Sequence, residues 1–122
     1  MTSSGHTVTT THSSARVEVR IGGELVASSE RALELHETGL PTRIYLPKDD
    51  VRMDLFRATT FHTTCPFKGE ASYWSTDVGG RAEDGIAWSY ETPIDTVPEI
   101  AGFVSFYPSR AEIIVDGEPL AA

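Results

Sequence analysis

One short segment of the chain gathers three side chains that could act together in nucleophilic catalysis. It runs from His62 to Gly69 and reads HTTCPFKG. Cys65 could attack as a thiolate, with His62 as the base and Lys68 lowering the pKa of the thiol. These side chains can meet only if the chain turns here, which Pro66 and Gly69 favour. The alternative is a small thiol that packs as an apolar side chain.

Lys68 has two further interpretations. A lysine between two turn-forming residues can project into solvent. Inside a cleft it can instead anchor a carboxylate or phosphate group of a ligand as a point charge. Its place next to an aromatic strand keeps the second interpretation open, so Lys68 is a candidate both for catalysis and for anchoring a ligand.

A second group of candidate residues combines carboxylates with a phenol. Glu37, Tyr45 and Asp50 lie near Arg52, and Glu37 stands at an expected strand end, where polar side chains approach a barrel mouth. Such groups can carry out acid–base chemistry when burial shifts their pKa values. Ordinary surface charges, with an aspartate that caps a helix, explain the same residues. Glu37 is kept as the candidate catalytic carboxylate.

Aromatic side chains are concentrated in the second half of the chain, where eight of the eleven follow Cys65. Core packing is the ordinary explanation for them. Tyr73 and Trp74, however, are adjacent on an expected strand and must point to opposite faces. Trp88 and Tyr90 lie two positions apart and share a face. The alternative to core packing is a pocket for a planar ligand, lined by Tyr45, Tyr73, Trp74, Trp88 and Tyr90.

The elements that must position these residues are mostly short strands. Residues 17–21 alternate apolar and charged side chains, which is typical of a strand with one wet face. Seven or eight such strands, separated by turns, predict a mainly β, single compact domain with a bent-sheet or barrel-like architecture. The expected strands cover residues 17–21, 25–27, 31–35, 44–46, 69–78, 86–90, 103–107 and 113–115.

One or two short helical turns interrupt this pattern. Residues 48–57 break the alternation, and Asp49 or Asp50 can cap a helix there. Residues 97–104 have helical spacing, with Pro98 tolerated in the first turn.

The first fourteen residues differ from the rest. Nine of them are Ser or Thr, and none is charged. Residues 1–14 are therefore predicted to form a disordered tail before a single β domain at residues 15–122. The tail lacks the positive start and the apolar stretch of a secretory signal. A single unpaired cysteine fits a reducing compartment, so we expect a cytoplasmic protein.

Composition argues against several classes of protein. The 18 acidic and 10 basic side chains give a net charge of −8, which argues against nucleic-acid binding. No apolar run approaches the about 20 residues of a membrane span. One cysteine cannot form an internal disulfide or a four-cysteine zinc site. We expect no metal, no cofactor, and a monomer or a weak homodimer formed by pairing of edge strands.

Five stretches, in this order, resemble the domain-of-unknown-function family 427: RALELHE, IYLPKDDVRMDL, TTCPFKGEASYWS, IAWSYETP and IAGFVSFYPSRAEIIVDGEPL. The family is mostly bacterial and also carries a nucleotidyltransferase-like name. The resemblance covers about residues 15–120 and implies a small, mainly β domain. It draws attention to Cys65 and Lys68 but implies no particular reaction. The sequence has no Gly-Ser turn followed by the paired aspartates that hold magnesium in common nucleotidyltransferases.

Two functions are compatible with the sequence. The first is a small-ligand-binding β domain, with or without weak enzymatic activity, whose aromatic pocket uses Lys68 and Glu37 as polar anchors. The second is a non-catalytic protein-interaction or structural module. A cavity into which Lys68 and Glu37 both point would favour the first function, and a filled core would favour the second.

Overall fold

The computed structural model describes residues 7–66, 68–78, 80–93 and 97–120. This part of the chain forms eleven strands, joined by turns and by three single-turn 3₁₀ helices. The strands are β1 (Val8–Ser13), β2 (Val17–Ile21), β3 (Glu24–Ser29), β4 (Ala32–Glu37), β5 (Arg43–Pro47), β6 (Phe56–Cys65), β7 (Gly69–Val78), β8 (Arg81–Ser89), β9 (Phe103–Phe106), β10 (Glu112–Val115) and β11 (Glu118–Pro119). The 3₁₀ turns are η1 (Lys48–Asp50), η2 (Met53–Leu55) and η3 (Pro98–Ile100).

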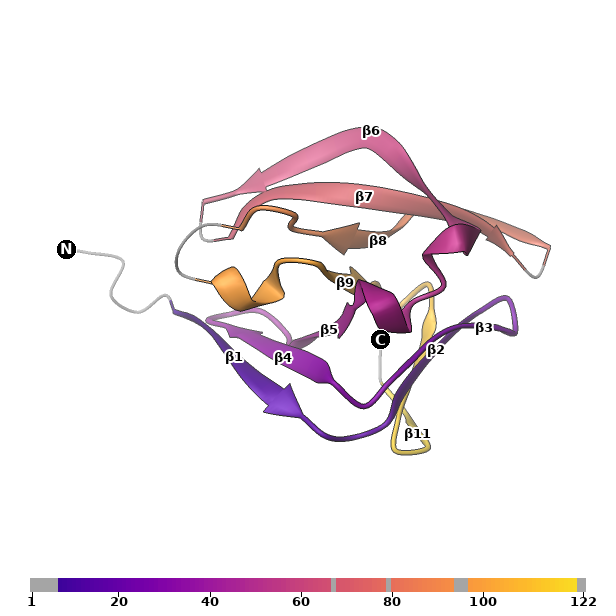
Figure 1. Ribbon diagram of the computed structural model, residues 1–122, viewed down its shortest axis with the longest axis horizontal. Helices are drawn as coiled ribbons and strands as arrows, with labels where there is room; N and C mark the ends of the chain where they lie inside the picture. Colours follow the sequence, from indigo (N-terminus) through magenta and orange to yellow (C-terminus); the bar gives the residue numbers. More distant parts are fainter. Residues whose placement is uncertain (1–6, 67, 79, 94–96, 121–122) are drawn as a thin grey trace.

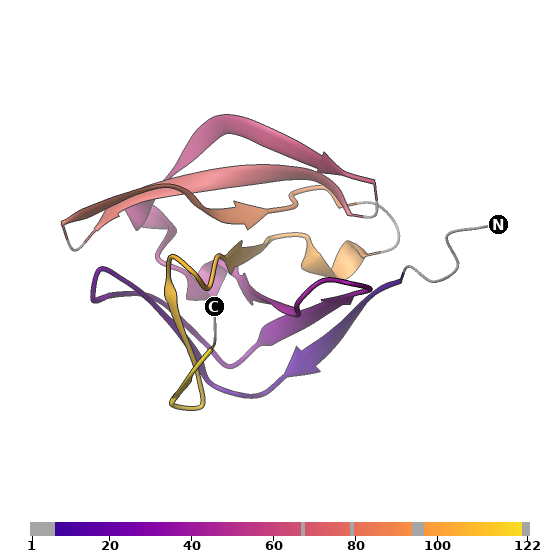
Figure 2. The same ribbon diagram turned by 180° about the vertical axis from the view of Figure 1, so that it is seen from behind.

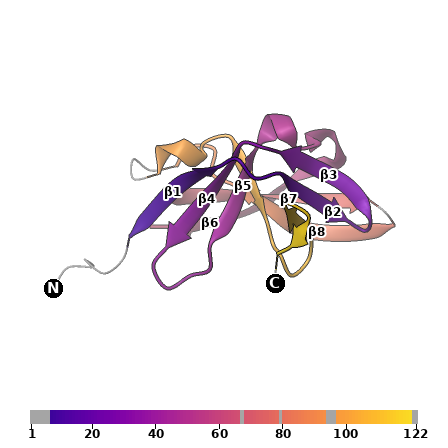
Figure 3. The same cartoon turned by 90° about the horizontal axis from the view of Figure 1, so that it is seen from below.

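The strands form two antiparallel sheets. The larger has the order β1-β4-β5-β9-β8-β7-β6, and the smaller has the order β11-β10-β2-β3. In Figure 1 the larger sheet bends, with β6, β7 and β8 along the top and β1, β4 and β5 along the bottom. Figure 2 shows the yellow hairpin of β10 and β11 from behind, and Figure 3 shows β1 beside β4.

The mainly β, bent-sheet prediction is confirmed. No hydrogen-bonded pairing joins β1 to β6 in the described residues, so the larger sheet is open and does not close into a barrel. The eight strands expected from the sequence are all present. The additional strands are β1, β6 and β11.

The larger sheet carries apolar side chains on both faces. Between the two sheets, Val17, Val19 and Ile21 of β2 pack in one cluster with Val104 and Phe106 of β9. The opposite face carries a second cluster, contributed mainly by β4, β5, β8 and the segment around η3. It contains Leu33, Leu35, Tyr45, Ala71, Trp88, Tyr90, Val97 and Ile100. Burial of these clusters is the main favourable contribution to folding.

The prediction of a disordered tail at residues 1–14 is wrong for residues 8–13, which form β1. This strand pairs with β4 from Val8 opposite Glu37 to Ser13 opposite Ala32. Threonine is β-branched and favours extended backbone, and β4 offers a row of backbone partners. Backbone hydrogen bonds to β4 therefore stabilise this segment, which has few apolar side chains to bury. Residues 1–6 lie outside the described residues.

β6 is the longest strand that the sequence did not reveal. Its ten residues form the outer strand of the larger sheet, and most of their side chains are exposed. A strand with solvent on both faces does not alternate apolar and polar side chains. That alternation is the pattern from which strands are predicted.

The one or two helical turns expected at residues 48–57 are present as the 3₁₀ turns η1 and η2. Val51, between them, forms an isolated bridge with Ala27 of β3. The backbone N–H of Arg52 donates to the carbonyl of Val26, 2.8 Å away. Pairing with β3 therefore interrupts the helix after one turn. The helical spacing at residues 97–104 is likewise realised only as η3.

Candidate functional site

Strand register brings three of the predicted aromatic residues into one row across the larger sheet. Leu33 of β4 lies opposite Tyr45 of β5, and Tyr45 lies opposite Ser105 of β9. Ser105 then lies opposite Trp88 of β8, which lies opposite Tyr73 of β7. Directly opposed residues share a face. Tyr45, Trp88 and Tyr73 therefore belong to one aromatic wall, although they are far apart in sequence.

This wall lines a hollow of about 200 Å³, which we call the inner pocket. It contains six of the residues predicted from sequence as site residues: Glu37, Tyr45, Lys68, Tyr73, Trp88 and Tyr90. The remaining lining residues are Leu35, Leu40, Pro41, Arg43 and Tyr107. The volume is below the range of about 300–1,000 Å³ that is typical of complete small-molecule sites. The inner pocket can therefore enclose a small molecule or one end of a larger one.

Lys68 and Glu37 form a buried ion pair in the wall of this pocket. The turn between β6 and β7 presents Lys68, whose Nζ donates a hydrogen bond to Oε1 of Glu37 at the end of β4. Lys68 is 9% exposed and Glu37 is 8% exposed. The interpretation of Lys68 as a solvent-facing lysine is therefore wrong. The ammonium also lies 6.0 Å from the ring centre of Tyr90.

Two phenols of the inner pocket, those of Tyr45 and Tyr90, are hydrogen-bonding groups in their neutral form. Burial raises the pKa of Tyr45, and the hydrogen bond between Trp88 and Tyr45 opposes that rise only in part. Burial also raises the pKa of Tyr90. Because both phenols keep their protons at neutral pH, they act as O–H donors rather than as bases.

Arg43 is a residue of the inner pocket that the sequence analysis missed. Its guanidinium carbon lies 5.7 Å from the ring centre of Trp88. Arg43 stands two positions before Tyr45 on β5, and side chains two apart on a strand share a face. The two-residue spacing could have predicted that Arg43 lies beside Tyr45, but only if Tyr45 was already known to face a pocket.

Trp74 is not part of the inner pocket. It follows Tyr73 on β7 and points to the opposite face, where it packs against the cluster between the two sheets. Its Nε1 donates to the hydroxyl of Ser89, 3.0 Å away, and the Lys48 ammonium lies 5.1 Å from its ring centre. The alternation of side chains along a strand therefore separates Trp74 from the other predicted ligand-binding residues.

The predicted group of His62, Cys65 and Lys68 is not assembled. The expected turn is present, and the backbone N–H of Lys68 donates to the carbonyl of Cys65. His62 and Cys65 are an odd number of positions apart on a regular stretch of β6, so their side chains face opposite ways. Cys65 is half-buried and packs against the second apolar cluster. A reactive Cys65 stays a prediction without His62 as its base.

The group of Glu37, Tyr45 and Asp50 is also divided. Asp50 accepts hydrogen bonds from the hydroxyl of Ser29, at 2.6 Å, and from the guanidinium of Arg31, at 3.0 and 3.2 Å. The hydrogen bond from Arg31, and then that from Ser29, lower the pKa of Asp50. Asp50 therefore fastens η1 to the turn between β3 and β4 and lies outside the inner pocket.

A second and larger hollow, which we call the outer groove, has a volume of about 910 Å³. It shares Tyr73 and Tyr107 with the inner pocket. Its other lining residues are Arg57, Ala58, Thr59, Thr60, Phe61, Thr63, Ser75, Asp84, Gly85, Ser109 and Arg110. The two hollows therefore meet at a pair of tyrosines.

A large bulge in β6 shapes this groove. Ala58 pairs with Trp74 and His62 pairs with Ser72, so residues 59–61 together face the single residue Tyr73. Figure 1 shows the middle of β6 bowing away from β7. Phe61, within the bulge, is 60% exposed, and its ring centre lies 5.1 Å from that of Tyr73. Bulges often occur where a strand must make room for a site.

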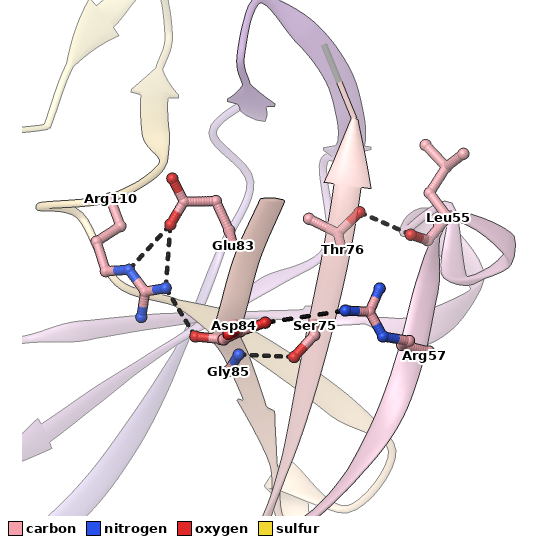
Figure 4. A network of polar contacts seen from close by, with 8 residues as sticks. All are labelled: Leu55, Arg57, Ser75, Thr76, Glu83, Asp84, Gly85 and Arg110. Atoms are coloured by element: carbon pink, nitrogen blue, oxygen red, sulfur yellow. Dashed lines mark hydrogen bonds and ion pairs between the residues drawn. The ribbon is translucent and has the colours of Figure 1, made fainter. Parts of the chain in front are cut away.

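The arginines of the outer groove have carboxylate partners (Figure 4). Arg110 donates from Nε and Nη2 to Glu83, at 3.2 and 3.0 Å, and from Nη2 to the carbonyl of Asp84. Arg57 lies 3.8 Å from the Asp84 carboxylate. The hydroxyl of Ser75 accepts from the backbone N–H of Gly85. The Ser75–Gly85 bond lies where the pairing of β7 with β8 is irregular, and the two arginine contacts balance the charges of the groove.

The residues described in the structure contain no group of three or more histidine, cysteine or acidic side chains that could hold a metal ion. Over the same residues, no helix has both the length and the hydropathy needed to cross a membrane.

The fold and its hollows define a small two-sheet β domain with a small aromatic pocket on one face of an open, bent sheet. Residues 9–117 match the family described as a domain of unknown function, DUF427, and the chain belongs to that family. No curated protein shows a significant match to the chain. The family assignment agrees with the resemblance noted in the sequence and leaves the activity to be inferred from the site.

Proposed function

We propose that this protein binds a small organic ligand in the inner pocket, with part of the ligand extending into the outer groove. The observation that carries the proposal is that five aromatic side chains line one hollow, although three of them also pack in the second apolar cluster. They are Tyr45, Tyr73, Trp88, Tyr90 and Tyr107. Large aromatic side chains normally close such a space by packing. An apolar wall with a few polar groups is the usual form of a small-molecule site.

The Lys68–Glu37 pair supports the proposal as part of the pocket wall. Removing two charges from water is costly, and a pair of apolar residues would stabilise the same position as well or better. The pair joins the β6–β7 turn to the end of β4 and gives one side of the pocket a polar surface. Lys68 and Glu37 would thus set the shape and polarity of the pocket, with the ligand lying beside them.

A thermal-shift screen of small metabolites tests the proposal, because a ligand that binds the folded state raises the melting temperature. A compound that raises the melting temperature should also change the fluorescence of Trp88. The Trp74→Phe variant makes this readout specific, because Trp74 and Trp88 are the two tryptophans of the chain. If compounds stabilise the protein but leave the emission of Trp88 unchanged, the inner pocket is not their site.

The proposal includes a cytoplasmic location, which the single unpaired cysteine favours, and a bacterial source, which the family resemblance implies. Weak turnover of the ligand would depend on Cys65, which packs in the apolar cluster beside the pocket. Loss of turnover, but not of binding, in Cys65→Ser would support that role.

A second candidate function is a non-catalytic protein-interaction module. β6 favours it, because this outer strand has ten mostly exposed residues and presents Phe61 to solvent. Such an edge can pair with an extended segment through backbone hydrogen bonds. A second copy of the chain would form a weak dimer that Phe61→Asp disrupts. A molecular mass that does not rise with concentration in sedimentation equilibrium would contradict this dimer.

A further inference from the structure

The charges of the inner pocket do not balance. Lys68 and Glu37 neutralise one another in their buried pair. Arg43 is half-buried in the same pocket, yet it makes no ion pair and no hydrogen bond with any residue that the structure describes. Its guanidinium lies over the ring of Trp88, 5.7 Å from the ring centre. Within the described residues, the pocket thus contains one positive charge without an ion-pair partner, in a protein whose net charge is −8.

Two hydroxyl groups add unused hydrogen-bond donors to the same hollow. The oxygen of Tyr45 accepts from Nε1 of Trp88, which leaves the proton of Tyr45 available to a ligand. Tyr90 is 5% exposed, and its hydroxyl makes no hydrogen bond within the described part of the chain. Arg43, Tyr45 and Tyr90 all line the inner pocket. Three donor groups around one small hollow fit a ligand group that only accepts hydrogen bonds.

The outer groove differs in this respect. Arg110 has two hydrogen bonds to Glu83, and Arg57 lies near the carboxylate of Asp84. Its remaining lining consists largely of threonine and serine side chains with the rings of Phe61, Tyr73 and Tyr107. This balanced and partly apolar surface fits the uncharged body of a ligand better than its charged end.

We infer that the inner pocket binds a carboxylate or phosphate group through Arg43, with the hydroxyls of Tyr45 and Tyr90 as further donors. The inference rests on the proposed function and adds the chemical class of the ligand, which is an organic anion with an apolar or aromatic body. A planar guanidinium can bind either group through two parallel hydrogen bonds. The ring of Trp88 holds the guanidinium in place from one side. The body passes Tyr73 and Tyr107 into the outer groove.

Matched probes test the charge requirement. Benzoate and phenyl phosphate carry the two proposed groups on an aromatic ring, and benzamide and benzyl alcohol are uncharged molecules of similar shape. Binding is followed by the emission of Trp88 in the Trp74→Phe variant and by ligand-observed NMR on the unaltered protein. We expect both anions to bind and the uncharged probes to bind at least about tenfold more weakly, which is ~1.4 kcal/mol.

Three arginine variants connect this preference to Arg43. Arg43→Gln should weaken benzoate binding at least about tenfold and bring it to the level of benzamide. Arg43→Lys keeps the charge and should retain part of the affinity, even if Arg43→Gln fails to fold. Arg52→Gln is the control, because Arg52 is exposed, makes only loose ion pairs with Glu24 and Asp54, and lines neither hollow.

The outcomes distinguish the two proposals. Equal binding of benzoate and benzamide, unchanged in both Arg43 variants, would overturn the anion inference and leave the proposed function standing. The absence of any effect on Trp88 from all four probes would overturn both proposals. Binding of the anions that is lost equally in Arg43→Gln and Arg52→Gln would also overturn the inference, because it would reflect overall charge.

Discussion

Nε1 of Trp88 donates a hydrogen bond to the hydroxyl of Tyr45 over 3.0 Å, although the two residues are 43 positions apart in sequence. Their rings meet edge to face, with centres 6.3 Å apart. β9 lies between their strands, and the shared register places both side chains on the same face of the sheet. This contact fixes the back of the inner pocket and leaves the hydroxyl proton of Tyr45 available to a ligand.

Tyr45→Phe should destabilise the protein by about 1–3 kcal/mol, because it leaves the buried indole N–H of Trp88 without an acceptor. Urea unfolding measures this loss. Tyr73→Phe is the matched control, because the Tyr73 hydroxyl interacts with the exposed Thr63 and the half-buried Tyr107, where water can replace it. Equal losses in both variants would contradict a special role for the Trp88–Tyr45 bond.

The Lys68–Glu37 pair should show strong energetic coupling. Lys68→Met or Glu37→Leu alone should cost about 3–5 kcal/mol, because each breaks a buried ion pair and leaves the other charge in a site of low exposure. The double variant should cost clearly less than the sum of the two single variants. A double-mutant cycle in urea measures the coupling, and additive losses would show that the two charges do not depend on one another.

Asp50 predicts a specific pH dependence of stability. Its pKa in the folded protein is below the ordinary 3.8, because Arg31 and Ser29 bind the carboxylate. Its contribution is therefore complete above the pKa of the unfolded chain and disappears as the pH falls through the folded pKa. Asp50→Asn should lower the free energy of unfolding by about 1–2 kcal/mol at pH 7, and the difference should shrink below about pH 4.

Asp54→Asn provides the control for this measurement. The side chain of Asp54 is largely exposed, and its contact with Arg52 is 3.5 Å long. Exposed pairs of this kind contribute little, so its effect should be close to zero at every pH. A loss of stability in Asp50→Asn that stays constant down to pH 2 would contradict the role assigned to the ionised carboxylate.

Cys65 should react slowly with thiol reagents in the folded protein, because it is half-buried against the apolar cluster and faces away from His62. Labelling with Ellman's reagent at neutral pH measures the rate. Phe61→Cys in a Cys65→Ser background places a thiol at an exposed position of the same strand and should react much faster. Faster labelling of the native Cys65 would instead support its role as a nucleophile.

The sequence predicts the fold where a strand buries one face. β2 is the clearest case, because Val17, Val19 and Ile21 alternate with charged residues. Side-chain alternation does not reveal β1 and β6, which lie at the two edges of the larger sheet and have mostly exposed side chains. β1 and β6 are held extended by backbone pairing with β4 and β7, respectively, and the pattern of side chains does not predict this pairing.

The candidate site was predictable to the extent that residue types suffice. The aromatic residues and the pair of Lys68 and Glu37 could be named, because such groups line ligand pockets. The register that places Arg43 beside Trp88 comes from long-range pairing through β9, which local patterns do not contain. Trp74 was wrongly predicted to line the pocket. Its place next to Tyr73 already implied that the two side chains face opposite sides of the sheet.

The most direct test of a ligand site in the inner pocket is the set of intermolecular nuclear Overhauser effects between phenyl phosphate and the protein. We predict contacts from the phenyl ring to the aromatic protons of Tyr73 and Tyr107, and a shift of the Arg43 guanidinium signals that benzyl alcohol does not cause. Contacts confined to Phe61, or none at all, with the Arg43 signals unchanged, would contradict the proposed site.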